Sequence, residues 1–261
     1  MSSAPRLFEE LDFRRTPMGD LILRRRVVPA LDHREVHEVI LGDAFLMSSL
    51  QTEVETALAT LGLAELEDRD DLSVVVGGLG LGYTAAAALV DPRVSSLLVV
   101  EAMDAVIDWH RRELVPLGRQ LSTDPRCRLV HGDFFALATN PQQGFDLDQP
   151  GRRFDAVLLD VDHSPTKWLH PSHAAFYQPR GMARLARQLT AGGVFGLWSD
   201  DPPDAVYLDV LGQVFADVRA EVVRFDNPLQ DRPAASTVYL ASSPAFDDNQ
   251  LAGAQGEPAG G

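Results

Sequence analysis

A glycine-rich turn between an apolar run and a helix-forming run is the part of the sequence best suited to hold a ligand. The run 73–76, which contains three β-branched valines, leads into Gly77, Gly78, Gly80 and Gly82, and the alanine-rich run 85–89 follows. Glycines keep side chains out of the path of a ligand, and the start of a helix offers free backbone N–H groups. This order of strand, turn and helix predicts a nucleotide-type binding turn.

The spacing of the glycines distinguishes between two kinds of nucleotide site. Gly78, Gly80 and Gly82 form the pattern GxGxG, whereas the dinucleotide fingerprint GxGxxG would need its third glycine at Tyr83. In that fingerprint the third glycine allows close packing of the helix and leaves room for a pyrophosphate. We therefore expect a nucleoside without a pyrophosphate, of the S-adenosylmethionine type. The alternative is a plain tight connection in an α/β sheet.

Acidic residues follow the next three apolar runs along the chain. Glu101 follows 96–100, Asp133 comes shortly after 126–130, and Asp160 ends the run 154–159. Parallel sheets bind ligands beyond the carboxyl ends of their strands, where these acids would meet the glycine turn. There Glu101 can accept hydrogen bonds from both ribose hydroxyls, and Asp133 from the adenine amine. Any one of these acids is more often a helix N-cap, but all three together predict a nucleoside pocket.

The order of the apolar runs predicts an α/β fold. Its core is a doubly wound, mostly parallel seven-stranded sheet with an antiparallel strand at one edge. The expected strands cover 73–76, 96–100, 126–130, 154–159, 194–198, 220–225 and 236–241. The expected helices cover 52–61, 85–89, 103–114, 174–189 and 204–215, with an interruption of the helix 174–189 near Pro179 and Gly181 left open.

The chain divides into three parts on this interpretation. Residues 1–65 form a small N-terminal β-hairpin and helix flap, too short to fold alone, with expected strands at 19–23, 38–41 and 44–47. Residues 66–245 form the nucleoside-binding Rossmann-like catalytic domain, and residues 246–261 form a flexible tail without apolar periodicity.

Composition excludes several classes of partner and site. The net charge of −15, with 38 acidic and 23 basic residues, argues against nucleic acid and fits a cationic small-molecule substrate, although it also simply favours solubility. The single cysteine, Cys127, indicates a reducing compartment. No apolar run reaches the roughly 18 residues that span a membrane. These features predict a cytoplasmic protein without a membrane partner.

The motifs resemble those of the spermidine and spermine synthases, the aminopropyltransferases. Residues 77–82, GGLGLG, stand where that family carries GGGDGG, and Glu101 and Asp133 match its ribose-binding and adenine-binding acids. Residues 160–165, DVDHSP, resemble its D-x-S/T-D-P segment. The resemblance covers most of residues 15–242. It implies a homodimer in which Asp160 is the base, with decarboxylated S-adenosylmethionine as donor and an amine or polyamine as acceptor.

The acceptor half departs from the family pattern. Gly80 replaces the aspartate of GGGDGG that helps hold the aminopropyl end, and the family's DE-x-x-YHE stretch is reduced to residues 52–56, TEVET. The D-x-S/T-D-P segment has also gained a residue. Aminopropyl transfer therefore stays only slightly ahead of methyl transfer from S-adenosylmethionine to a small-molecule or peptide acceptor. A non-catalytic binding or assembly protein is the third interpretation.

The chemistry assigns roles to a few further side chains. Transfer from a sulfonium to an amine needs an in-line arrangement and a base, and Asp160 is the expected base and cofactor contact. Asp162, His163 and Tyr177 are candidates to orient the acceptor, and Trp198 to pack against it. Asp162 and His163 are equally compatible with a turn before Pro165. The histidines and aspartates of residues 160–173 match no closed metal motif, so no metal is predicted.

Overall fold

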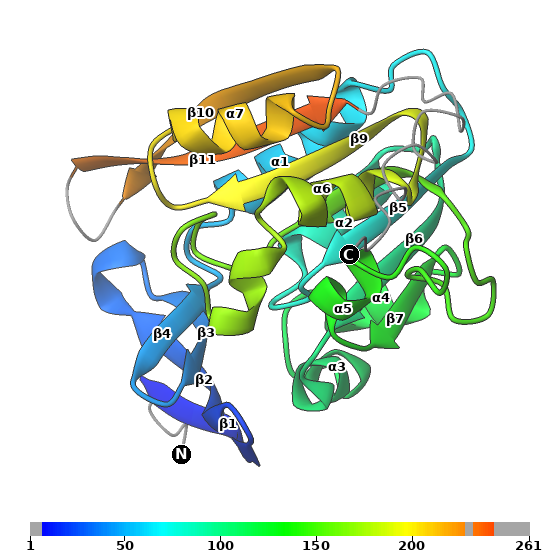
Figure 1. The fold of residues 1–261 in the computed structure, drawn as a ribbon. Helices are drawn as coiled ribbons and strands as arrows, with labels where there is room; N and C mark the ends of the chain where they lie inside the picture. Colours follow the sequence, from blue (N-terminus) through cyan, green and yellow to red (C-terminus); the bar gives the residue numbers. More distant parts are fainter. Residues whose placement is uncertain (1–6, 228–231, 243–261) are drawn as a thin grey trace, which may run out of the picture.

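The computed structural model describes residues 7–227 and 232–242, which form two β-sheets with helices around the larger one (Figure 1). The smaller sheet has four strands in the order β1-β2-β3-β4, and the larger has seven in the order β10-β11-β9-β8-β5-β6-β7. The predicted seven-stranded, mostly parallel sheet with a β-rich N-terminal appendage is confirmed. The predicted tail, residues 246–261, lies outside the described residues.

The N-terminal sheet is an antiparallel meander that projects from the body of the molecule (Figure 1). Its strands are β1 (Phe8–Thr16), β2 (Gly19–Val28), β3 (Arg34–Leu41) and β4 (Ala44–Ser48). Strand β1 is not among the expected strands. The basic run 24–26 belongs to β2, where Arg24 and Arg26 both pair with the buried carboxylate of Glu38 on β3, at 2.7 and 2.6 Å. The arginines of this run therefore stabilise the N-terminal sheet through cross-strand ion pairs.

The large sheet is parallel except at one strand. Its members are β5 (Leu72–Gly77), β6 (Val94–Glu101), β7 (Cys127–His131), β8 (Phe154–Leu159), β9 (Leu189–Ser199), β10 (Asp217–Asn227) and β11 (Arg232–Ser242). The antiparallel strand is β11, which lies one position in from the edge because the β10-β11 hairpin inserts its second strand beside β9. The expected place of the antiparallel strand, at the edge itself, is thus corrected.

Helices cover both faces of this sheet. They are α1 (Glu53–Ala64), α2 (Tyr83–Val90), α3 (Asp104–Arg111), α4 (Gly118–Thr123), α5 (Phe134–Ala138), α6 (Pro179–Ala186) and α7 (Ala205–Gly212). Val74 and Val76 of β5 point into the core on one face and Val75 into the core on the other, so the strand is apolar throughout. The expected helix 174–189 is shorter than predicted, because α6 begins at Pro179, whose fixed φ suits the first helical position.

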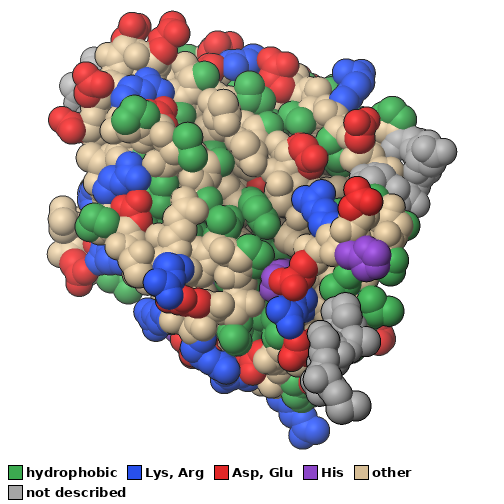
Figure 2. All heavy atoms as spheres, turned by 180° about the vertical axis from the view of Figure 1, so that it is seen from behind, with side chains coloured by type: hydrophobic (Ala, Val, Ile, Leu, Met, Phe, Trp, Pro, Cys, Tyr) green, Lys and Arg blue, Asp and Glu red, His purple; other side chains and the backbone are tan. Residues whose placement is uncertain are grey.

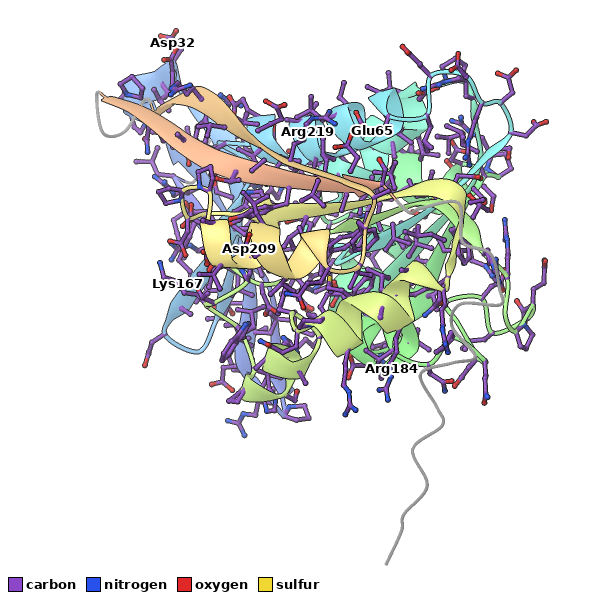
Figure 3. All side chains as sticks on the ribbon, turned by 45° about the horizontal axis from the view of Figure 1, so that its top comes forward. Asp32, Glu65, Lys167, Arg184, Asp209 and Arg219 are labelled. Carbon is purple, nitrogen blue, oxygen red and sulfur yellow. The ribbon has the colours of Figure 1, made fainter. Side chains whose placement is uncertain are left out.

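Helix α1 packs against the large sheet. It contacts α2, β8, β9 and β11, although the predicted division at residue 65 groups it with the N-terminal strands. At its end, Glu65 forms a two-pronged ion pair with Arg219 of β10, with both oxygen–nitrogen distances at 2.6 Å (Figure 3). The helix is therefore held against one face of the sheet, and only its first turn reaches the carboxyl ends of the central strands, where the site described next lies.

Candidate active site

A cavity of about 600 Å³ lies at the carboxyl ends of the strands of the large sheet. The glycine turn, β4 and the first turn of α1 all contribute to its lining. On one side it extends past Glu101, the last residue of β6, to Asp133 after β7. On the other side it extends past Trp198 of β9 to Ser236 of β11 and Phe225 of β10. We call these the β6–β7 half and the β9–β10 half; Asp160, after β8, lies between them.

The glycine turn has the backbone conformation that its spacing predicts. Gly78, Gly80 and Gly82 have φ angles of +91°, +48° and +93°, in the region that other residues rarely adopt. A Cβ atom on Gly78 would lie 2.1 Å from the carbonyl oxygen of Asp160, so the turn packs directly against the end of β8. Gly77 has a different role, because a Cβ there would meet the ring of Phe134 at 2.4 Å, and Gly77 does not line the cavity.

Glu101 is the buried support of this turn. Its carboxylate accepts hydrogen bonds from the backbone N–H of Leu79 at 3.0 Å and of Met103 at 2.8 Å, and its exposed fraction is only 7%. Burial raises the pKa of this carboxyl above its ordinary value, while the backbone N–H donors partly oppose the shift. Glu101 thus joins the glycine turn to the start of α3 and also lines the cavity, where the ribose is predicted to bind.

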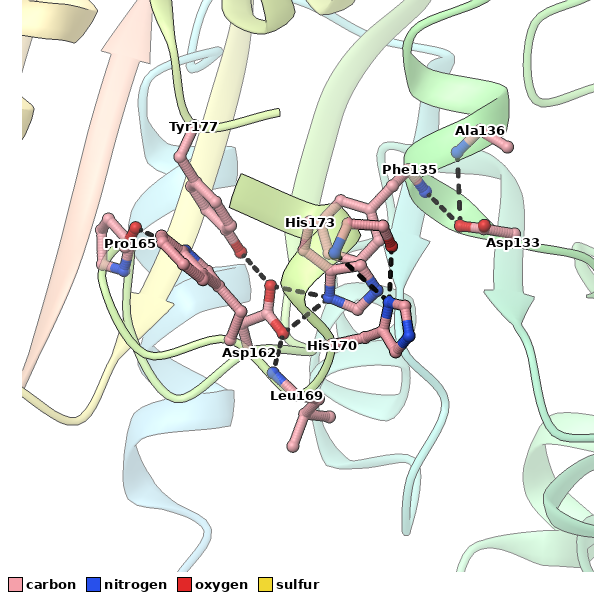
Figure 4. A network of polar contacts seen from close by, with 11 residues as sticks. Asp133, Phe135, Ala136, Asp162, Pro165, Leu169, His170, His173 and Tyr177 are labelled. Atoms are coloured by element: carbon pink, nitrogen blue, oxygen red, sulfur yellow. Dashed lines mark hydrogen bonds and ion pairs between the residues drawn. The ribbon is translucent and has the colours of Figure 1, made fainter. Parts of the chain in front are cut away.

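Asp133 is both a helix cap and a cavity residue. One carboxylate oxygen accepts from the backbone N–H of Phe135 at 2.9 Å and of Ala136 at 3.3 Å, which caps α5 (Figure 4). The residue is exposed and lines the β6–β7 half. Asp133 can therefore cap α5 and also bind a ligand, because the cap occupies only one of its two carboxylate oxygens. Its contact with adenine stays a prediction.

Asp160 shares the cavity with a second carboxylate, that of Glu55 in the first turn of α1. Asp160 accepts a hydrogen bond from the hydroxyl of Thr84 at 2.8 Å. Burial raises the pKa of Asp160 to about 6, and burial together with the charge of Asp160 raises the pKa of Glu55 to about 8. Near neutral pH the ligand-free protein therefore holds a proton on this pair of acids.

The raised pKa of Glu55 predicts a pH dependence of stability. Between its ordinary value of 4.5 and about 8, the folded protein binds more protons at Glu55 than the unfolded chain does. The free energy of unfolding must therefore fall as the pH rises through this window. Glu55→Gln removes this contribution, so the variant should lose less stability than the parent between those pH values.

Denaturant unfolding of parent, Glu55→Gln and Glu67→Gln at several pH values between 4.5 and 8 measures this difference. Glu67 is an exposed acid in the loop before β5, at the opposite edge of the sheet from the cavity. The Glu67→Gln variant should show the same pH dependence of the free energy of unfolding as the parent. If the free energies of unfolding of the parent and Glu55→Gln change equally with pH, the pKa of Glu55 is not raised, which would contradict the burial of its carboxyl.

Asp162 and Tyr177 lie behind the cavity wall. Asp162 has an exposed fraction of 0% and accepts from the backbone N–H of Leu169 at 2.7 Å, the hydroxyl of Tyr177 at 2.8 Å and Nδ1 of His173 at 2.9 Å (Figure 4). Neither Asp162 nor Tyr177 lines the cavity. Asp162 and Tyr177 therefore hold the segment 162–177 in place. They do not face the cavity, so the expectation that they orient the acceptor directly is corrected.

His163 and Trp198, two other predicted contacts, do line the cavity. The carbonyl oxygen of His163 accepts from the backbone N–H of Asp200 at 2.7 Å, which ties the loop after β8 to the end of β9. His173 also reaches the lining and stacks on Phe135 with ring centroids 3.8 Å apart. Within the described ranges, no group of three or more histidines, cysteines or acids has a metal-binding arrangement.

Two residues that the sequence did not point to also belong to the site, Glu55 in the lining and His110 beneath the glycine turn. His110 lies on α3 and is fully buried, as are Val106 and Ile107 of the same helix. Its Nε2 also lies 2.9 Å from the carbonyl oxygen of Gly80, so the imidazole supports the turn from below. Burial lowers the pKa of His110, which keeps the ring neutral. Only the meeting of α3 with the turn in space could have revealed this contact.

The cavity is strongly acidic. Six carboxylates line it, and no lysine or arginine of the described residues does; the acids are Glu53, Glu55, Glu101, Asp133, Asp160 and Asp200. By contrast, acidic and basic side chains are interspersed over the outer face that Figure 2 shows. The negative lining is therefore a property of the cavity, and it favours a ligand that carries positive charge.

Comparison with known proteins finds distant sequence relatives among putrescine N-methyltransferases. No protein-family model matches the chain. Putrescine N-methyltransferases 3 and 1 of Nicotiana tabacum are 27% and 26% identical to it over 151 residues, or 56% of the chain. The aligned part is 34% of each of those proteins, so the chain spans about a third of the length of the curated relatives it matches.

Two solved structures share the fold over nearly the whole chain. Spermidine synthase from Thermotoga maritima has a TM-score of 0.67 and 16% identity, covering 95% of this chain and 79% of that one. A spermidine synthase in complex with the transition state analogue AdoDATO has the same TM-score and 15% identity, covering 95% and 80%. The resemblance that the motifs indicated is thus confirmed at the level of the fold. No helix among the described residues has the length and apolar character to cross a membrane.

Proposed function

We propose that this protein is a spermidine synthase-like transferase that binds an S-adenosylmethionine-type donor and moves a group from its sulfonium to an amine. The observation that carries this proposal is the acidic cavity at the carboxyl ends of the strands, with the glycine turn in one half and Asp160 at the border with the other half. Donor and acceptor would both be cationic, which agrees with a lining of carboxylates.

The β6–β7 half fits the donor. The positive φ angles of the turn leave the backbone of residues 78–82 open to a ligand, and Glu101 and Asp133 line the cavity after the next two strands. We assign the ribose hydroxyls to Glu101 and the adenine amine to Asp133. When bound, the donor supplies an electrophilic carbon attached to a positively charged sulfur.

The side chains at the border and in the β9–β10 half fit the acceptor. Asp160 takes the proton that the attacking amine must lose, and the rigid turn and sheet hold the reacting atoms in line. His163 and Trp198 line the wall next to it and can position the body of the acceptor. Asp162 and Tyr177 act indirectly, because they hold the segment from which His163 and His173 reach the cavity.

Aminopropyl transfer from decarboxylated S-adenosylmethionine is the first candidate reaction, because the fold likeness to spermidine synthases covers 95% of the chain. Methyl transfer from S-adenosylmethionine is the second, and one observation favours it. A Cβ on Gly80 would lie 2.6 Å from Sδ of Met47, so the thioether fills the space of the aspartate that the GGGDGG motif carries. The matched part of the sequence also resembles putrescine N-methyltransferases.

Calorimetric titration with the two nucleosides tests the proposal. We expect tighter binding of decarboxylated S-adenosylmethionine than of S-adenosylmethionine. The reverse preference would assign methyl transfer. Binding of neither would overturn the proposed function and leave a non-catalytic binding or assembly protein as the interpretation.

A homodimer and a cytoplasmic location also belong to this proposal. The dimer is implied by the family resemblance, and the location by the single cysteine and the absence of a long apolar run in the sequence. Sedimentation of the purified protein would measure the oligomeric state, with a mass near twice 28.5 kDa expected.

A further inference from the structure

We propose that Glu55 and Asp160 together form the binding site for the ammonium group of the acceptor, and that Glu55 is the residue that selects an amine there. This inference rests on the proposed transfer function. It goes further by naming the group that the β9–β10 half must recognise and a residue that recognises it.

The placement of Glu55 carries the argument. The residue lies in the first turn of α1 between Val54, which is buried, and Thr56, which is exposed, so it stands at the margin of the buried helix face. This margin faces the cavity, and Glu55 lines it together with Asp160. Because α1 packs on β8 and β9, the helix brings Glu55 to the border between the donor half and the acceptor half.

Glu55 has no cationic partner among residues 7–227 and 232–242. The groups that act electrostatically on its carboxyl are two acids, Asp160 and Glu53, and Glu55 in turn acts on the phenol of Tyr83. Its hydrogen bond is to its own backbone N–H. A half-buried carboxylate surrounded by other acids is costly unless a positive charge reaches it. In the ligand-free protein a proton supplies that charge, and a bound ammonium can replace it.

The same pair of acids then serves the reaction. The bound ammonium gives one proton to the pair, and the nitrogen lone pair forms a bond to the donor carbon. The bond between that carbon and sulfur breaks with its electron pair on sulfur, which becomes a neutral thioether. The new substituted ammonium carries the positive charge, and the pair later releases its proton to solvent. Two carboxylates suit these steps, because the pair can hold either a proton or the ammonium group and can pass from one to the other during the reaction.

The walls beside the pair indicate what the rest of the acceptor is like. Trp198 and Phe225 line the β9–β10 half, and Val54 lies next to Glu55. These side chains suit the methylene groups of an alkyl amine, while Glu55 and Asp160 hold its nitrogen.

Amine titration of the nucleoside-bound protein tests the inference. Parent, Glu55→Gln and Asp209→Asn are first titrated with both donor nucleosides, and then with putrescine in the presence of saturating 5′-methylthioadenosine. Asp209 is a matched control for the loss of one negative charge, because it is exposed on α7 and lies outside the cavity lining (Figure 3). We expect Glu55→Gln to keep the parent's nucleoside affinity and to bind putrescine about tenfold to a hundredfold more weakly. Asp209→Asn should match the parent in both titrations.

The outcomes separate this inference from the function on which it rests. Equal putrescine affinity in the parent and Glu55→Gln, or no putrescine binding to the nucleoside-bound parent, would overturn the inference while the proposed donor site stands. Failure of the parent to bind either donor nucleoside would overturn the proposed function, and the inference with it. A loss of nucleoside affinity in Glu55→Gln equal to its loss of putrescine affinity would also overturn it, because Glu55 would then serve the donor.

Discussion

Replacing Asp160 with asparagine is expected to slow the transfer step about 10²- to 10⁴-fold and to leave the nucleoside affinity close to that of the parent. The carboxylate is the group at the border of the two halves that can take a proton from the amine. Asparagine has nearly the same shape, and its amide oxygen can still accept the hydrogen bond that Thr84 gives to Asp160 at 2.8 Å. The change therefore removes the base and keeps the local structure.

Single-turnover rates with saturating donor and amine measure the first part of this result, and calorimetry with the nucleoside alone measures the second. Asp209→Asn, the exposed matched control, should transfer at the parent's rate. The rate of the parent itself should fall as the pH drops below about 6, because burial raises the pKa of Asp160 to about 6 and its protonated form cannot act as a base. An Asp160→Asn variant that transfers at the parent's rate would show that the base lies elsewhere.

Replacing Glu101 with alanine is expected to weaken nucleoside binding more than any other single change outside the glycine turn. The side chain both faces the ribose in our assignment and accepts from the N–H groups of Leu79 and Met103. Alanine leaves those two donors without their partner in a buried place, which costs about 1–3 kcal/mol for each group. The turn would then lose the conformation that its glycines allow.

Two measurements separate the structural and binding parts of this effect. Denaturant unfolding gives the loss of stability, and calorimetry under conditions where the variant is still folded gives the loss of affinity, expected to be about thirtyfold or more. Glu67→Ala removes an exposed glutamate at the opposite edge of the sheet and should change neither quantity. Unchanged nucleoside affinity in folded Glu101→Ala would remove Glu101 from the proposed donor site.

The acidic cavity connects these expectations. Removing Asp160 affects proton transfer, removing Glu101 affects the donor, and removing Glu55 affects the acceptor amine, although all three carboxylates line one cavity. Their separate effects follow from their places in the fold: Glu101 ends β6, Asp160 follows β8, and α1 brings Glu55 to β8 and β9. Measuring the three variants in the same titrations would therefore map the cavity from donor to acceptor.

Local patterns in the sequence were enough to predict which strand-end residues line the half of the cavity that we assign to the donor. A β-branched run, alternating glycines and the acids after successive strands are short-range features, and parallel strands must bring their carboxyl ends to one edge. Glu101, Asp133 and Asp160 accordingly lie in the lining, next to Gly78, Gly80 and Gly82. The mostly parallel sheet could likewise be predicted, since strands that are buried on both faces form continuous apolar runs.

Only the tertiary structure decided which residues line the half of the cavity that we assign to the acceptor. Glu55 reaches Asp160 because α1 packs across β8 and β9, a contact between segments far apart in the chain that no spacing in either segment indicates. Asp162 turns away from the cavity to bind Leu169, His173 and Tyr177, since neighbouring residues of a loop take directions set by the partners that satisfy them. The sequence by itself determined the sheet, the glycine turn and the strand-end acids; long-range packing and buried hydrogen bonds determined which other side chains face the ligand.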